Sequence, residues 1–178
     1  DDLGEANLWS LLDSESLEFR ARLERLSSRW YAATLASTRA VDSRAAAVEA
    51  GAPDLRAWLI HRLHVQHAEA GREVRLAAQL VDDLPVAAAA LAVGEITGAA
   101  VAVIADTNTE LARFATAAEC SEAEAVLVGH ARTLNVRQLQ NAALHLRHRL
   151  DPDHGARLAK EEQQQVARRE FRLHLHPD

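Results

Sequence analysis

The sequence predicts an all-α domain: a multi-helix bundle with a long N-terminal helix and a short β-strand that begins near the C-terminal end. Hydrophobic residues make up 48% of the 178-residue chain and aromatic residues only 4%. The apolar share is mostly alanine, leucine and valine, and the first two favour helices. Residues 15–50 contain no proline or glycine, and side chains suited to capping helix starts recur at Thr97, Ser121 and Asn135.

The first predicted element is a long amphipathic helix over residues 15–50, with an expected bend near Ser37-Thr38. Its apolar residues recur at roughly helical spacing: Leu17, Leu23, Leu26, Trp30, Ala33 and Leu35. The Gly-Ala-Pro sequence at 51–53 ends it. A long helix with an uninterrupted apolar stripe is typical of a surface that packs against another copy of the chain.

Three shorter helices follow, separated by clear breaks. Asp54 is the expected N-cap of a helix over 55–63, and a second helix covers 67–81. Pro85 stands where proline is favoured, at the first helical position of the third, and Gly94 ends that helix.

Capping signals predict three further helix starts. Thr97 is the expected N-cap of the next helix, with Ile96 and Val101 at the positions of a hydrophobic staple. The sequence N-V-R-Q at 135–138 has the pattern of a capping box, and S-E-A-E at 121–124 has the same pattern. We therefore expect helices that begin after residues 97, 121 and 135.

The C-terminal part combines two helices with the start of a strand. The helix over 136–150 is stopped by Asp151-Pro152, and a polar helix is expected over 153–169. The alternation that starts at Phe171 indicates a strand, and because a lone strand has no partner, we expect the polypeptide to continue. The predicted organisation is a helical arm over 1–50, a helical core domain over 51–170 and a further strand or module starting at 171–178.

Cysteine content and polarity indicate a cytoplasmic protein. Cys120 is the only cysteine in the chain, which excludes an intrachain disulfide and fits a reducing compartment. The acidic N-terminus lacks the pattern of a signal peptide. Residues 84–105 have the length of a membrane span, but Pro85, Glu95 and two glycines argue against one.

Charge is unevenly distributed along this chain of net charge −6. Residues 82–128 hold eight acidic side chains and one basic one, whereas residues 129–178 hold nine basic and six acidic ones. A surface that faces phosphate groups is therefore expected in the C-terminal third.

Three sets of histidines have spacings that could hold a metal ion. They are His61, His64 and His67; His145 and His148; and His174 and His176. A turn expected near Val65 would separate the first three, and no further ligand has a matching spacing, so exposed histidines are the favoured interpretation for each set.

Residues suited to catalysis are scarce. Cys120 lies just before a predicted helix start, where the helix dipole would lower a thiol pKa, but no histidine stands beside it in the sequence. We interpret this cysteine as structural. No nucleophile elbow, phosphate-binding loop or zinc-protease motif occurs in the sequence, so neither a small-molecule substrate nor a cofactor is expected in this chain.

Two segments have the pattern of a helix–turn–helix. The helix after Thr97 carries alanine and valine, so we assign it to the core. The helix that begins at His67 carries Arg72, Arg75 and Gln79, whose side chains suit base edges. The alternative is a pair of antiparallel helices with a solvated arginine face.

Several short sequence segments between residues 57 and 173 resemble one family. They are A-W-L at 57–59, V-R-L-A at 74–77, L-P-V-A-A-A-A-L-A-V-G-E-I-T at 84–97, V-I-A-D at 103–106, G-H-A-R-T-L-N-V-R-Q-L at 129–139, R-H-R-L-D-P-D at 147–153 and R-R-E-F-R-L at 168–173. In this order and spacing they resemble the actinobacterial domain of unknown function 222 family, also called the 13E12 repeat family. The likeness covers residues 50–178.

The resemblance implies a parent protein that cuts DNA, because members of this family usually carry an HNH nuclease domain further along the chain. A divalent metal would be expected only in that domain. No HNH motif occurs within these 178 residues, so none of the family's catalytic residues can be assigned here.

Two hypotheses of function follow. In the first, the chain is an accessory module of an HNH endonuclease-type protein and positions DNA or the nuclease domain. Arginines that could contact DNA phosphates are Arg132, Arg137, Arg147, Arg149, Arg168 and Arg169. In the second, it is a protein-interaction module that forms a homodimer through the helix over 15–50 and does not contact DNA.

Overall fold

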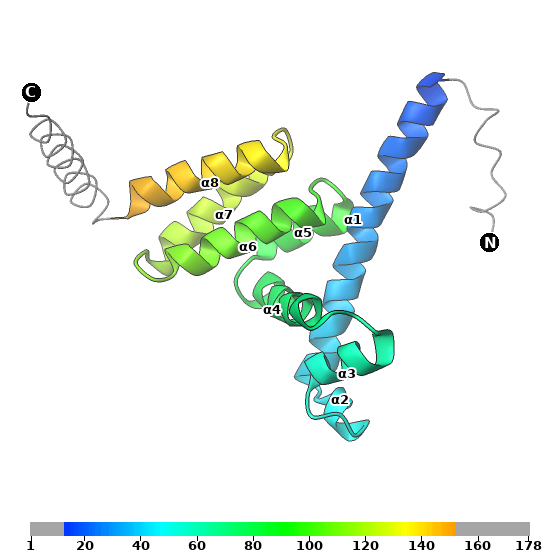
Figure 1. The fold of residues 1–178 in the computed structure, drawn as a ribbon. Coiled ribbons are helices and arrows are strands. Elements are labelled where there is room, and N and C mark those ends of the chain that lie inside the picture. The colour runs from blue at the N-terminus through cyan, green and yellow to red at the C-terminus, as the bar shows by residue number, and fades with distance from the viewer. Residues whose placement is uncertain (1–12, 152–178) are drawn as a thin grey trace, which may run out of the picture.

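The computed structural model describes residues 13–151, which form eight α-helices (Figure 1). In chain order they are α1 (Asp13–Ser43), α2 (Ala46–Glu49), α3 (Leu55–Leu63), α4 (His67–Asp82), α5 (Pro85–Val93), α6 (Gly98–Leu111), α7 (Ala117–Ala131) and α8 (Val136–Leu150). The all-α prediction is confirmed for this part of the chain. The helix expected over 153–169 and the strand expected from Phe171 lie outside the described residues.

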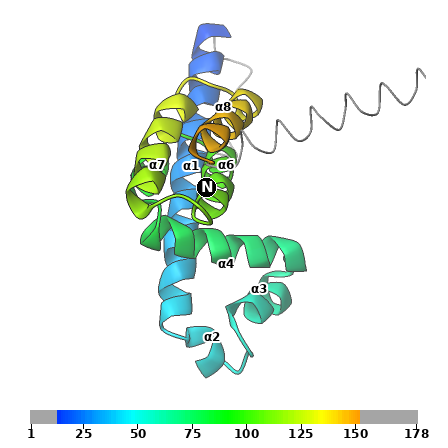
Figure 2. The same cartoon turned by 90° about the vertical axis from the view of Figure 1, so that its left-hand side faces the viewer.

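α1 is a long rod to which the other helices attach (Figures 1 and 2). The helices α5 to α8 form a block beside it, α4 crosses below this block, and α2 and α3 lie at the C-terminal end of the rod. The first turns of α1 project past the block, and Leu17 on one of these turns is 74% exposed.

The main core lies between α1, α4 and the block of α5 to α8. Leu35 from α1 is buried there with Leu84, Leu91, Ile104 and Leu139, and each such leucine contributes roughly 1.5–3 kcal/mol. No single helix within residues 13–151 is long and apolar enough for a membrane span; α4 and α5 meet that criterion only as a pair, and they are bent by 108° at their junction.

Two glycines allow α1 to approach the turn between α5 and α6. Gly94 ends α5 with φ +78°, as predicted, and a Cβ there would lie 2.8 Å from the backbone oxygen of Arg25. A Cβ at Gly98 would lie 2.6 Å from the ring of Tyr31. The backbone of the α5–α6 turn therefore packs directly on the middle of α1.

Three predicted N-caps are confirmed. The side chains of Asp54, Thr97 and Asn135 each accept a hydrogen bond from a backbone N–H three residues later. Ile96 and Val101 are both buried beside the Thr97 cap, as a hydrophobic staple requires.

The predicted capping box at Ser121 is wrong. α7 begins one turn earlier, where Thr116 Oγ1 accepts from the backbone N–H of Glu119 at 3.3 Å, and Glu119 Oε2 accepts from the backbone N–H of Thr116 at 2.8 Å. Ser121 lies inside the helix. Glu124 is buried in the core, and its Oε1 accepts from the backbone N–H of Ala87 at 2.8 Å, so it caps the start of α5 instead.

The prediction of one helix over 15–50 also needs correction. α1 runs without a break through Ser37 and Thr38 to Ser43, and the chain turns at Ala45, which has φ 53°. The four-residue α2 follows. The predicted bend is absent, and the buried side chain of Thr38 donates a hydrogen bond to Glu73 of α4 at 2.7 Å.

Candidate functional site

Two of the arginines predicted to contact DNA are paired with glutamates. Arg132 Nη2 lies 2.8 Å from Glu95 Oε2, and Arg147 forms an ion pair with Glu110. The first pair joins the end of α7 to the turn between α5 and α6, and the second joins α8 to α6. In each pair the carboxylate offsets the positive charge that a DNA phosphate would meet.

The other two described arginines of this set are exposed and form no ion pair within residues 13–151. Arg137 and Arg149 both lie on α8, about 18 Å apart along the axis and about 120° apart around it. Arg149 lines a small hollow with Glu119 and Glu122. These four arginines therefore do not form one continuous basic surface. Arg168 and Arg169 lie outside the described residues.

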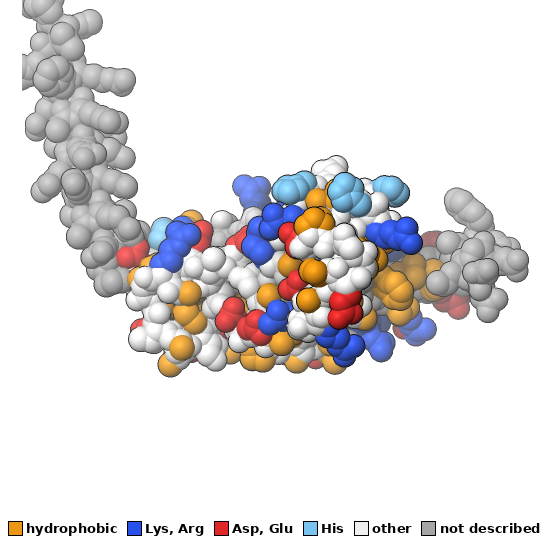
Figure 3. Space-filling model, turned by 90° about the horizontal axis from the view of Figure 1, so that it is seen from below, with side chains coloured by type: hydrophobic (Ala, Val, Ile, Leu, Met, Phe, Trp, Pro, Cys, Tyr) orange, Lys and Arg blue, Asp and Glu red, His pale blue; other side chains and the backbone are white. Residues whose placement is uncertain are grey.

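Of the histidine candidates, His61, His64, His67 and His145 are exposed, and His148 is half-buried. α3 ends at Leu63, and His64 adopts φ 57°, so the predicted turn separates His61 from His67. Figure 3 shows histidine side chains gathered at one edge of the lower face. No group of three His, Cys, Asp or Glu side chains within residues 13–151 is placed to hold a metal ion. His174 and His176 are not among the described residues.

Cys120 differs from its predicted environment. It lies within the first turns of α7, half-buried, and its pKa is raised by burial and by the charges of Glu119 and Asp83. The expected lowering of the pKa is therefore wrong, because burial first, and then the two carboxylates, disfavour the thiolate.

The two helix–turn–helix candidates differ in how far the side chains of their second helix are exposed. The assignment of the helix after Thr97 to the core is confirmed, since Val101 and Ile104 are fully buried. Gln79 does not face solvent as a base reader would, because its Nε2 donates to Thr109 Oγ1 at 2.7 Å. Arg72 and Arg75 remain exposed.

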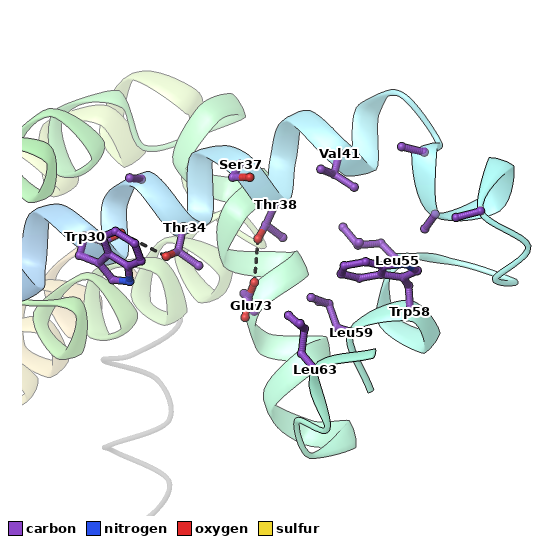
Figure 4. Close-up of a pocket in the computed structure, with 14 residues that line it drawn as sticks. Trp30, Thr34, Ser37, Thr38, Val41, Leu55, Trp58, Leu59, Leu63 and Glu73 are labelled. Atoms are coloured by element: carbon purple, nitrogen blue, oxygen red, sulfur yellow. Dashed lines mark hydrogen bonds between the residues drawn. The ribbon is translucent and has the colours of Figure 1, made fainter. Parts of the chain in front are cut away.

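An apolar groove of about 630 Å³ lies between α1 and α3 (Figure 4). One wall is α1 from Trp30 to Val41, and the other is the face of α3 that carries Leu55, Trp58 and Leu59. Leu63 stands at its edge and is 56% exposed.

Few polar groups line this groove. The carboxylate of Glu73 accepts from Thr38 Oγ1, and Thr34 Oγ1 donates to the backbone oxygen of Trp30 at 3.1 Å. Burial, followed by the charge of Glu73, raises the pKa of Tyr31 near by. Because the Thr34 and Thr38 hydroxyls and the Glu73 carboxylate are already hydrogen-bonded, the groove offers mainly apolar contact.

The groove continues along α1 as an apolar stripe that is exposed from Leu26 onward and half-buried at Phe19 and Leu23. This outward stripe consists of Phe19, Leu23, Leu26, Trp30, Ala33 and Ser37. Leu26 is 55% exposed and Trp30 is 77% exposed. The residues that pack on the core, including Ser28, Leu35 and Thr38, lie on the other side of the helix. α1 therefore has two apolar faces, of which one is covered within residues 13–151.

The sequence indicated part of the stripe but not the groove. Leu17 and Leu35, predicted to belong to the same apolar stripe, lie on the opposite side of α1, where Leu35 is buried in the core. Leu55, Trp58 and Leu59 recur at helical spacing on α3, which could have identified a second apolar face. Its position opposite α1 depends on the turn at Ala45 and on α2, which no local pattern specified.

Comparison with family models identifies the chain. A family described as "Domain of unknown function (DUF222)" matches residues 17–177. The chain belongs to the DUF222 family. The match covers all of α2 to α8 and most of α1, so the outward stripe and the groove lie within this DUF222 domain. Searches of curated proteins and of solved structures found no match.

Proposed function

We propose that this DUF222 domain is a non-catalytic protein-interaction module, with the outward stripe of α1 and the adjoining groove as its binding surface. The observation that carries the proposal is the exposure of Trp30 and Leu26 on a stripe that runs directly into an apolar groove. Tryptophan is among the side chains that dominate protein interfaces, and contiguous exposed apolar surface marks interaction sites.

The test uses a labelled three-heptad peptide with leucine at the a and d positions, held at nanomolar concentration and titrated with the full chain. Fluorescence anisotropy should report binding. Trp30→Glu and Leu26→Glu should each weaken it at least tenfold, since a central interface residue contributes about 2 kcal/mol or more.

Leu17→Glu is the matched control. Leu17 is 74% exposed on the same helix but lies away from the outward stripe, so this change should leave peptide binding unchanged. Equal loss in all three variants would contradict the proposal, and so would no binding of the peptide to a wild-type chain that sediments as a monomer.

A second candidate function, supported by Arg137 and Arg149 and by the implied link to HNH endonucleases, is the positioning of DNA. Both side chains are exposed and unpaired within residues 13–151, and phosphate contacts require arginine or lysine without a particular base sequence. A nuclease domain and its divalent metal would belong to the parent protein.

Salt-dependent binding of a labelled DNA duplex tests this candidate. Each lost phosphate contact lowers the slope of log K against log salt by about 0.9, so Arg137→Ala with Arg149→Ala should lower it by about 1.8. Arg44→Ala with Arg113→Ala, two exposed positions elsewhere, is the control. Absence of binding at low salt would exclude DNA positioning by this chain.

A further inference from the structure

The spacing of the outward stripe matches that of a coiled coil. From Phe19 to Ser37 its residues follow one another at alternating intervals of four and three, which is the heptad pattern with Leu23, Trp30 and Ser37 at a and Phe19, Leu26 and Ala33 at d. This 3.5-residue period keeps a seam facing one partner helix along its whole length. A helix with the same period is the complementary partner, and α1 itself is such a helix.

We infer that the outward stripe is covered by the same stripe of a second copy of this chain, with the two α1 helices parallel and in register. This inference rests on the proposed interaction function and names its partner. The first turns of α1 stand clear of the block (Figures 1 and 2), and the block packs on the side of α1 opposite the stripe. The block of α5 to α8 therefore leaves the stripe open to a second helix.

The charges beside the stripe select the orientation. Arg22 and Arg29 occupy the g positions, whereas Ser27 and Thr34 occupy e positions. In a parallel pair each g residue faces an e residue of the other copy in the next heptad, so Arg22 meets Ser27 and Arg29 meets Thr34.

Antiparallel pairing is disfavoured by the same residues. It places g positions opposite g positions, and in the registers that overlap most of the stripe Arg22 or Arg29 faces an arginine of the other copy. Like charges at that separation repel each other. The parallel arrangement opposes no two of these g-position arginines.

The groove adds contact area at the C-terminal end of the stripe. The α1 residues that line it include Trp30, Ala33 and Ser37 of the stripe, and α3 stands beside them with Leu63 exposed (Figure 4). A second α1 that lies on the stripe also covers this edge of α3. One helix thus fills both the stripe and the mouth of the groove.

Disulfide trapping tests partner and orientation together, in a full chain in which Cys120→Ala removes the native thiol. In the parallel pair Leu26 faces Leu26 of the other copy, so Leu26→Cys should form a cross-linked dimer under mild oxidation because d positions bring the Cβ atoms close. Leu17→Cys, on the other side of the helix, is the control and should stay uncross-linked. Equal cross-linking of the two variants would overturn the inference, and so would a failure of Leu26→Cys to cross-link.

Sedimentation equilibrium gives the second measurement. The wild-type chain should sediment at about twice its 19.4 kDa mass, Trp30→Glu should halve that value, and Leu17→Glu should not change it. Circular dichroism checks that the variants keep their helices. A wild-type chain that is monomeric but still binds the leucine peptide would overturn the inference that the partner is a second copy, and would leave the proposed interaction function standing. A monomer that binds no peptide would overturn both the inference and the proposed function.

Discussion

Glu124 shows how one buried carboxylate links two helices. Its side chain is 2% exposed, and it accepts from the first turn of α5 while Oε2 has no hydrogen-bond partner within residues 13–151. Burial raises the pKa of Glu124 above its ordinary value, and the backbone hydrogen bonds only partly offset this. The folded state therefore holds its proton more tightly than the unfolded state.

This raised pKa predicts a pH-dependent loss of stability. The contribution of Glu124 is fully present below its unfolded pKa and falls as pH rises through its folded pKa, because the buried group must then ionise. Glu124→Gln keeps an oxygen for the Ala87 N–H and cannot ionise. Its free energy of unfolding, measured with urea, should rise relative to wild type between pH 4 and pH 8. Glu122→Gln, at an exposed site on the same helix, is the control, and a pH-independent difference would contradict the prediction.

Gly94 is predicted to tolerate replacement poorly. Alanine there would adopt φ +78° and place its Cβ 2.8 Å from a backbone oxygen of α1. Left-handed geometry costs about 1–2 kcal/mol and overpacking about 1–3, so we expect Gly94→Ala to lose about 2–4 kcal/mol of stability. Gly129→Ala, which meets no atom within 4 Å, should gain about 0.5–1 kcal/mol. Equal urea midpoints would contradict this account.

At the scale of elements, helix starts depend on single side chains, and α7 offers a direct test. Thr116→Ala should cost about 1 kcal/mol because it removes the N-cap. Ser121→Ala should cost nothing or stabilise slightly, since Ser121 lies inside the helix, where alanine is preferred. Thermal unfolding of the two variants measures the difference. A larger loss of stability for Ser121→Ala than for Thr116→Ala would instead support the helix start that S-E-A-E predicted.

For the whole molecule, the inferred pairing through α1 makes stability depend on concentration. Association of folded chains stabilises them by mass action, so the Tm of the wild-type chain should rise with protein concentration. Trp30→Glu should abolish this dependence, and Leu17→Glu should preserve it. Scanning calorimetry across a hundredfold range of concentration makes the measurement, and a constant wild-type Tm would contradict the pairing.

The sequence by itself determined the helical class and most helix boundaries. At Asp54, Thr97 and Asn135 the N-cap side chain accepts a hydrogen bond from a backbone N–H only three residues later. Gly94 ends a helix because its own backbone adopts a positive φ. Such signals are local, so they can be interpreted without knowing the fold. Part of the apolar stripe of α1 was visible for the same reason, because it is a periodicity within one helix, but the predicted stripe also included Leu35, which is buried on the other face.

Only the tertiary structure decided which side chains remain available for function. Arg132 and Arg147 each pair with a glutamate 37 residues away, and Glu124, which resembled part of a local cap, serves a helix start 37 residues before it. The groove requires α3 to fold back beside α1. The physical reason is that ion pairs, burial and grooves depend on distances between segments far apart in the chain, which no local pattern records.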